Sequence, residues 1–81
     1  MVKVSREFAG RRVTILGLGV FSGGTSSARY FAAQGADVTV TDLQSDKELS
    51  TSIKSLSNWP IRYVLGEHRE KDIIDADLVV V

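Results

Sequence analysis

The chain reads VTILGLGVFSGG from Val13 to Gly24, an apolar run that enters a glycine-rich turn ahead of a helix-period pattern. This order is typical of the start of a βαβ nucleotide-binding unit. Gly17 lets the chain turn sharply off the strand, and Gly19 lets a phosphate approach the main chain. Gly23 and Gly24 let the first helical turn pack tightly and expose its N–H groups. Those N–H groups and the helix dipole predict an anion site that needs no basic side chain.

The glycine pattern departs from a strict G-x-G-x-x-G, because Ser22 stands where the third glycine is expected. Its setting adds weight, since a strand precedes it, a helix follows it, and Asp42 ends the next strand. The alternative is that the glycines only make a tight strand–helix turn. Four glycines within eight residues exceed what such a turn needs.

Length and composition exclude several classes of protein. The 81 residues allow one small domain, and the formal net charge is zero. A balanced chain has no general attraction for nucleic acid or for an anionic membrane. The absence of cysteine excludes disulfides and thiolate chemistry. The charged first residues carry no apolar signal-peptide region and no run is long enough to span a membrane, so we expect a cytoplasmic protein.

The chain stops within an apolar run, residues 78–81, that predicts a buried strand. We therefore expect residues 1–81 to form a single N-terminal domain of a longer multidomain protein. An exposed sheet edge at this strand would also allow two copies of the chain to pair with each other.

Hydrophobic periodicity predicts an α/β fold with the order βαβαβαβ. We expect strands over residues 12–16, 36–41, 61–65 and 77–81, and helices over residues 25–34, 46–56 and 70–75. The apolar helix faces are expected at Ala28, Phe31 and Ala32, and at Leu49, Ile53 and Leu56, with Ser45 or Asp46 as the N-cap of the second helix. Short connections predict a Rossmann-like parallel sheet of order 3-2-1-4 with helices on both faces.

Few residues are candidates for chemistry. Asp42 follows Gly17 by close to the roughly 20 residues at which an acid meets a nucleotide's sugar or base, although it could instead cap the following turn. Ser22 and Thr25 either donate to a phosphate or cap the helix, and Gly66 either borders a ligand or makes a turn. His68 is interpreted as solvated surface. No catalytic set and no metal-spaced cluster can be assembled, so the chain is interpreted as a binding unit.

Four blocks resemble the N-terminal domain of a Mur ligase, over about Gly10 to Val81. They are RVTILGLGV at 12–20, SG at 22–23 with ARYF at 28–31, QGADVTVTD at 34–42, and Gly66 followed by DADLVVV at 75–81. Within that family the chain is most similar to the ligases that join D-glutamate to UDP-N-acetylmuramoyl-L-alanine in peptidoglycan synthesis.

The resemblance implies that this domain holds the UDP moiety of that substrate. The loop from Gly19 to Gly24 would face the diphosphate, while Asp42, Leu43 and Gly66 would border the uridine. The UDP-binding residues implied in this way are Gly17, Gly19, Val20, Phe21, Ser22, Gly23, Gly24, Thr25, Asp42, Leu43 and Gly66. ATP and magnesium would serve other domains of the parent protein, which activate the substrate carboxylate for attack by the amino acid, and no cofactor is implied for this fragment.

Two departures from the family pattern lie in these loops. Phe21 is inserted into the usual G-x-G-x-[ST]-G loop and a second glycine follows, while Leu43 and Gln44 replace small polar or basic residues. Two other functions stay open. One is an NAD-binding domain of a dehydrogenase, in which Asp42 would bond a ribose hydroxyl. The other is a non-catalytic nucleotide-sensing module.

Overall fold

The computed structural model describes residues 8–18 and 23–81. The candidate residues Gly19, Val20, Phe21 and Ser22 lie outside the described residues. The described elements are β1 (Arg12–Leu16), α1 (Gly23–Ala33), β2 (Asp37–Asp42), α2 (Ser50–Ser55), β3 (Ile61–Leu65), α3 (Glu70–Ile74) and β4 (Leu78–Val80). The alternation of strands and helices that the sequence predicts is confirmed.

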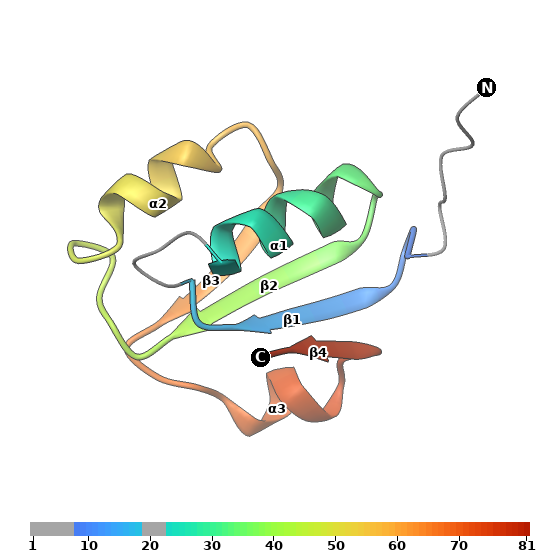
Figure 1. Ribbon diagram of the computed structural model, residues 1–81. Coiled ribbons are helices and arrows are strands. Elements are labelled where there is room, and N and C mark those ends of the chain that lie inside the picture. Colours follow the sequence, from blue (N-terminus) through green and yellow to red (C-terminus); the bar gives the residue numbers. More distant parts are fainter. Residues whose placement is uncertain (1–7, 19–22) are drawn as a thin grey trace.

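The four strands form one parallel sheet with the order β3-β2-β1-β4. Val13 of β1 lies between Val38 of β2 and Leu78 of β4, and Val38 is in turn opposite Ile61 of β3. Figure 1 shows α1 and α2 on one face of the sheet and α3 on the other. The predicted Rossmann-like α/β fold and its strand order are therefore confirmed, and the carboxyl ends of the strands meet at one edge.

The apolar core lies between the sheet and the helices α1 and α2. Alternate strand residues face it, since successive side chains of a strand point to opposite faces. The buried members are Val13, Ile15, Leu18, Ala28, Ala32, Ala36, Val38, Val40, Leu49 and Leu56, with Phe31, Ile53, Ile61, Tyr63 and Leu65 packed against them. The helix faces that the sequence predicts are confirmed.

The opposite face of the sheet carries buried threonines beside apolar residues such as Val64, and α3 covers it with specific hydrogen bonds. Thr14, Thr39 and Thr41 are buried there, on the strand positions between the apolar ones. The Thr14 hydroxyl donates to the main-chain oxygen of Asp72 at 2.7 Å. Arg62 Nη2 of β3 pairs with Asp72 Oδ1 at 2.7 Å. No residue of α3 itself is buried. Polar contacts, rather than apolar packing, therefore hold this helix on the sheet.

The helix boundaries differ in part from those predicted. The first helix begins at Gly23 instead of Thr25, and α2 begins at Ser50 instead of Asp46. Ser45 does cap this segment, because its hydroxyl accepts from Glu48 N at 3.4 Å and Glu48 Oε1 accepts from Ser45 N at 3.2 Å. Residues 46–49 that follow form a hydrogen-bonded turn, and the α-helix starts only after it. The bounds of β2 and β4 differ from the prediction by one residue.

Candidate functional site

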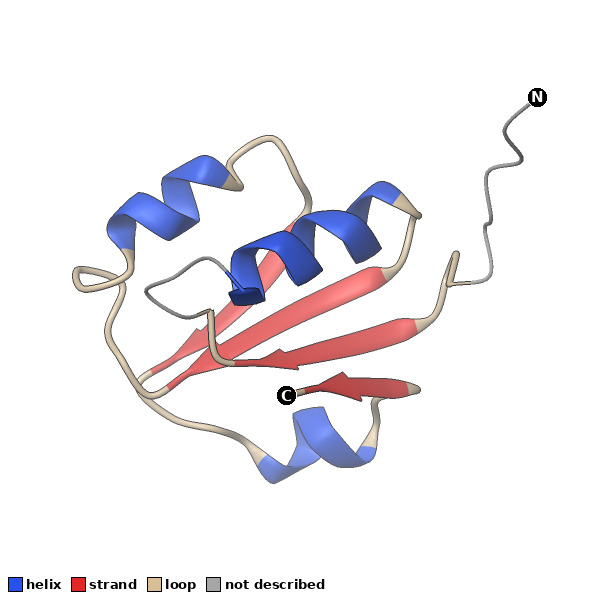
Figure 2. Cartoon of the chain, in the orientation of Figure 1, coloured by secondary structure: helices blue, strands red, loops and turns tan. Residues whose placement is uncertain are grey.

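The candidate site lies where β1, β2 and β3 end at the same edge of the sheet. Gly17, Leu43 and Gly66 are the first residues after these three strands. Parallel strands run in one direction, so the loops that follow them come together, as Figure 2 shows. Gly66 therefore lies at the same edge of the sheet as Gly17 and Asp42.

Gly17 makes the turn off β1. Its φ is +94°, a conformation that a side chain disfavours, and the predicted sharp turn is confirmed. Its N–H donates to the main-chain oxygen of Thr41 at 2.7 Å and so continues the ladder between β1 and β2. The Gly17 N–H is therefore engaged within the sheet and is not free to bond a phosphate.

Asp42 is the most connected residue of this edge. Its Oδ2 accepts from Leu18 N at 2.9 Å, and its Oδ1 accepts from Gln44 N at 2.9 Å. Its main-chain oxygen accepts from Gly66 N at 2.8 Å. Only 8% of Asp42 is exposed. The bond to Gln44 confirms that Asp42 caps the turn after its own strand, whereas the bond to Leu18 is one that the sequence does not predict.

The first turn of α1 packs directly against the end of β1. A Cβ added at Gly24 would collide with the main-chain oxygen of Gly17 and lie 2.6 Å from the oxygen of Leu18, so the close packing predicted there is confirmed. A Cβ at Gly23 would meet nothing within 4 Å, so the same prediction is wrong for Gly23. Within the described residues, no main-chain hydrogen bond outside the helices starts from the N–H of Gly23, Gly24 or Thr25. The start of α1 therefore lies close to Gly17 and Leu18.

Thr25 and Leu43 differ in their surroundings. Thr25 lies within the first turn of α1 and is buried, so it is not the N-cap. Its Oγ1 has no hydrogen-bond partner in the part of the chain that the structure describes. Leu43 is 67% exposed, an unusual setting for a large apolar side chain. Gly66 has a φ of +82° and open space at its Cα, so it makes the turn after β3 and leaves room beside it.

His68 is tied to the sheet from the α3 side. Its Nδ1 and the hydroxyl of the fully buried Thr41 form a hydrogen bond of 2.7 Å. The imidazole is exposed, as the sequence predicts, but it also anchors the loop after β3 to β2. No signal in the sequence marks this pair, since it depends on how the loop after β3 folds back across β2.

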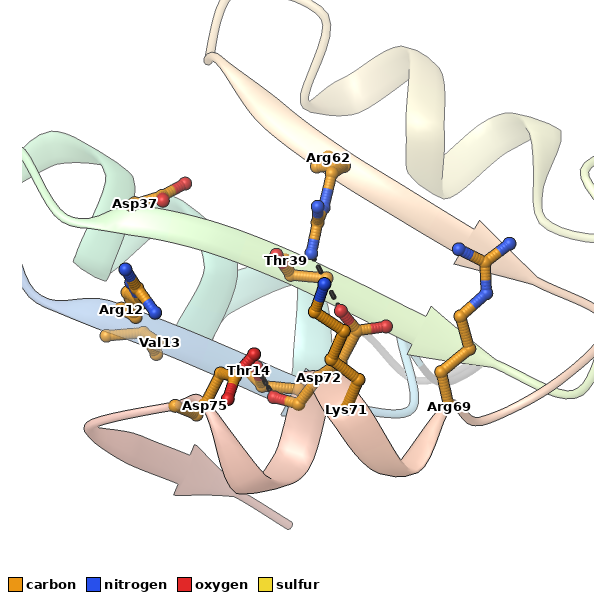
Figure 3. Close-up of a pocket in the computed structure, with 11 residues that line it drawn as sticks. Arg12, Val13, Thr14, Asp37, Thr39, Arg62, Arg69, Lys71, Asp72 and Asp75 are labelled. Atoms are coloured by element: carbon orange, nitrogen blue, oxygen red, sulfur yellow. Dashed lines mark hydrogen bonds and ion pairs between the residues drawn. The ribbon is translucent and has the colours of Figure 1, made fainter.

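The hollows on the described surface include two of similar volume. One of about 380 Å³ opens beside Gly66 and is lined by Ser45, Asp46, Tyr63, Leu65 and Gly66. Burial raises the pKa of the Tyr63 phenol above its ordinary value of 10.0. The other, of about 360 Å³, lies on the α3 side and is rich in charged side chains, with Arg62 and Asp72 pointing toward one another (Figure 3). Its lining residues Arg12 and Asp37 begin their strands, so it extends toward the edge opposite the glycine turn.

Two further properties concern residues 8–18 and 23–81 alone. In these ranges no three or more His, Cys, Asp or Glu side chains are grouped so that they could hold a metal ion. None of the helices in the same ranges has the length and apolar character needed to cross a membrane.

Comparisons with known proteins identify the family to which the chain belongs. A family model described as "Mur ligase MurD-like, N-terminal domain" matches residues 11–81. Proteins named UDP-N-acetylmuramoylalanine–D-glutamate ligase are 53% identical over 74 residues in Roseiflexus sp. (strain RS-1), 47% over 72 in Treponema pallidum (strain Nichols), and 44% over 75 in Trichlorobacter lovleyi. These matches cover 91%, 88% and 93% of the chain but only 16%, 14% and 16% of the relatives. The chain therefore belongs to the family of MurD-like N-terminal domains of the Mur ligases.

Proposed function

We propose that this chain binds the UDP moiety of UDP-N-acetylmuramoyl-L-alanine, as the N-terminal domain of a D-glutamate-adding ligase. The names of the three relatives support this choice, since each contains that substrate and that amino acid. The structural observation that carries the proposal is the meeting of three strand ends at one edge, next to the start of α1.

The diphosphate is proposed to lie at the first turn of α1. The contact of Gly24 with Gly17 and Leu18 brings this turn against the carboxyl end of β1. Main-chain N–H groups at the start of an 11-residue helix favour an anion without a basic side chain, which agrees with a chain of zero net charge. We propose that the loop Gly19–Ser22 also faces the diphosphate.

The uridine is proposed to lie beside Leu43 and Gly66. The exposed Leu43 side chain offers an apolar surface to a flat base, and the missing side chain of Gly66 leaves room next to it. Burial and hydrogen bonding of the adjacent Asp42 keep the main chain on both sides of this space in place.

We place the chemical step outside these residues. The chain spans about one sixth of the length of the relatives it matches. Amide bond formation, with ATP and magnesium as its requirements, is assigned to other parts of a longer, cytoplasmic protein of peptidoglycan synthesis. This chain contributes substrate binding and no catalytic group.

A titration followed through backbone amide shifts tests the proposal. UDP and UDP-N-acetylmuramoyl-L-alanine are expected to shift the amides of Gly24, Leu43 and Gly66. The amides of Gly35 and Asp77, at the opposite edge of the sheet, are expected to stay unchanged and serve as internal controls. Shifts with NAD and none with UDP would favour a dehydrogenase domain and overturn the proposal. A parent sequence without an ATP-binding loop after Val81 would favour a nucleotide-sensing module.

A further inference from the structure

We infer that Asp42 is a positioning residue that joins the three loops of the site before any ligand is present. The inference rests on the proposed function, because it concerns the same edge of the sheet. Asp42 reaches Leu18 in the loop after β1, Gln44 in the loop after β2, and Gly66 in the loop after β3.

Three oxygen atoms of Asp42 accept these hydrogen bonds. Oδ2 accepts from Leu18 N, which is 24 residues earlier in the chain, and Oδ1 accepts from Gln44 N, both at 2.9 Å. The main-chain oxygen accepts from Gly66 N at 2.8 Å. Hydrogen bonds to an ionised acceptor are shorter and stronger than neutral ones, and burial keeps water from competing for them.

A carboxylate is required for both side-chain bonds at once. Asparagine has nearly the same shape but only one acceptor oxygen, and its amide nitrogen is a donor. Whichever way an asparagine side chain at position 42 turned, its NH₂ group would face either the Leu18 N–H or the Gln44 N–H. One of these donors would lose its acceptor in a buried or partly buried setting, which is costly.

The fixed loops give the site its shape in the free protein. A ligand that binds ordered loops does not have to order them, so less of its binding free energy is lost. Asp42 acts here through Leu18, Gln44 and Gly66, and a direct bond to the ligand is not needed for this effect.

Hydrogen exchange of the free chain tests the inference with Asp42→Asn. The exchange rate of the Leu18 or the Gln44 amide is expected to rise about tenfold or more, as for loss of a charge-assisted hydrogen bond. The affinity for UDP, measured by calorimetry, is expected to fall about tenfold as the loops lose their order. Asp37→Asn is the matched control, because Asp37 is exposed and starts the same strand at the opposite edge. It is expected to change neither quantity.

A second variant separates positioning from general stability. Thr14→Val removes a hydrogen bond on the α3 face and leaves the carboxyl edge intact. The free energy of unfolding is measured for both variants. If UDP affinity depended only on that free energy, Thr14→Val and Asp42→Asn would weaken binding in proportion to their loss of stability. The inference expects weaker binding for Asp42→Asn alone.

A measurement on the unmodified chain completes the test. A scalar coupling across the hydrogen bond from the Leu18 nitrogen to the Asp42 carboxylate carbon is expected, and its absence would overturn the inference even if Asp42→Asn did not fold. If Asp42→Asn weakened UDP binding but left the exchange rates of the Leu18 and Gln44 amides unchanged, Asp42 would contact the ligand directly. That result would also overturn the inference. Failure of the unmodified chain to bind UDP would refute the proposed function, while the exchange rates would still decide the role of Asp42.

Discussion

Gly24 is the residue at which the helix and the strand approach most closely. Replacement by alanine would place a Cβ 2.6 Å from the Leu18 oxygen and closer still to that of Gly17, and both are main-chain atoms that cannot turn away. Gly24→Ala is therefore expected to lower the free energy of unfolding by about 2 kcal/mol or more. Urea denaturation followed by circular dichroism measures this change.

The neighbouring glycine provides the control for this prediction. A Cβ at Gly23 meets nothing within 4 Å, and alanine favours a helix by up to about 1 kcal/mol over glycine. Gly23→Ala is thus expected to be neutral or slightly stabilising. Equal effects of the two substitutions would contradict the close packing of α1 on the end of β1.

Among the elements, α3 depends most on single polar contacts. Thr14→Val keeps the shape of the side chain but removes the bond to the main-chain oxygen of Asp72. The loss of about 1 kcal/mol is expected to speed amide exchange in α3 about fivefold, with β2 amides unaffected. Thr39→Val is the matched control, because Thr39 is buried on the same face without a hydrogen bond from its hydroxyl to the described part of the chain. Equal exchange in the two variants would show that this bond does not hold α3.

Element positions could be predicted well because each strand is a short apolar run that a glycine or a polar loop ends. The residue at which α2 begins could not be predicted from the sequence. Ser45 and Glu48 form the expected capping pattern, but Leu49 departs from helical geometry and the helix begins one residue later. Local sequence marks where a turn begins and does not fix how far it continues before a regular helix is established.

The location of the candidate site could be predicted from the sequence, but the hydrogen bonds within it could not. Glycines after β1 and β3 and the acid at the end of β2 indicate the edge of the sheet, because parallel strands end together. The bonds from Leu18 N to Asp42 and from Thr41 to His68 depend on tertiary placement, namely the register of β1 on β2 and the path of the loop after β3. A single sequence carries no direct record of that placement.

For the molecule as a whole, stability is expected to decrease at alkaline pH. Burial raises the pKa of Tyr63 above its ordinary value of 10.0. Between that value and the folded-state pKa, the unfolded chain has lost the phenolic proton and the folded chain retains it. The free energy of unfolding therefore falls as pH rises above 10, and the contribution is fully present only below it.

Urea midpoints measured from about pH 8 to about pH 11 check this dependence. Tyr63→Phe is expected to make the decrease shallower, since a phenylalanine has no proton to lose. The control is Tyr30→Phe, which removes a phenol that is 55% exposed on α1, and the decrease should persist in it. An unchanged slope in Tyr63→Phe would contradict the prediction.

The two faces of the sheet are built by different interactions. Apolar packing against α1 and α2 supports one face, and hydrogen bonds and an ion pair to α3 support the other. Among the described residues β4 has a partner strand only in β1, so pairing of two copies through its outer edge stays a prediction.

The bond from Gly66 ends on a main-chain oxygen, whereas the bond from Leu18 ends on a side chain. Every amino acid at position 42 supplies the first acceptor, whereas the second requires a side-chain oxygen at the right distance. A chimaera could thus exchange its third loop for that of another protein without regard to residue 42. A chimaera that transplants the first loop must also carry a side-chain acceptor at the end of the second strand, so these two segments have to be exchanged together.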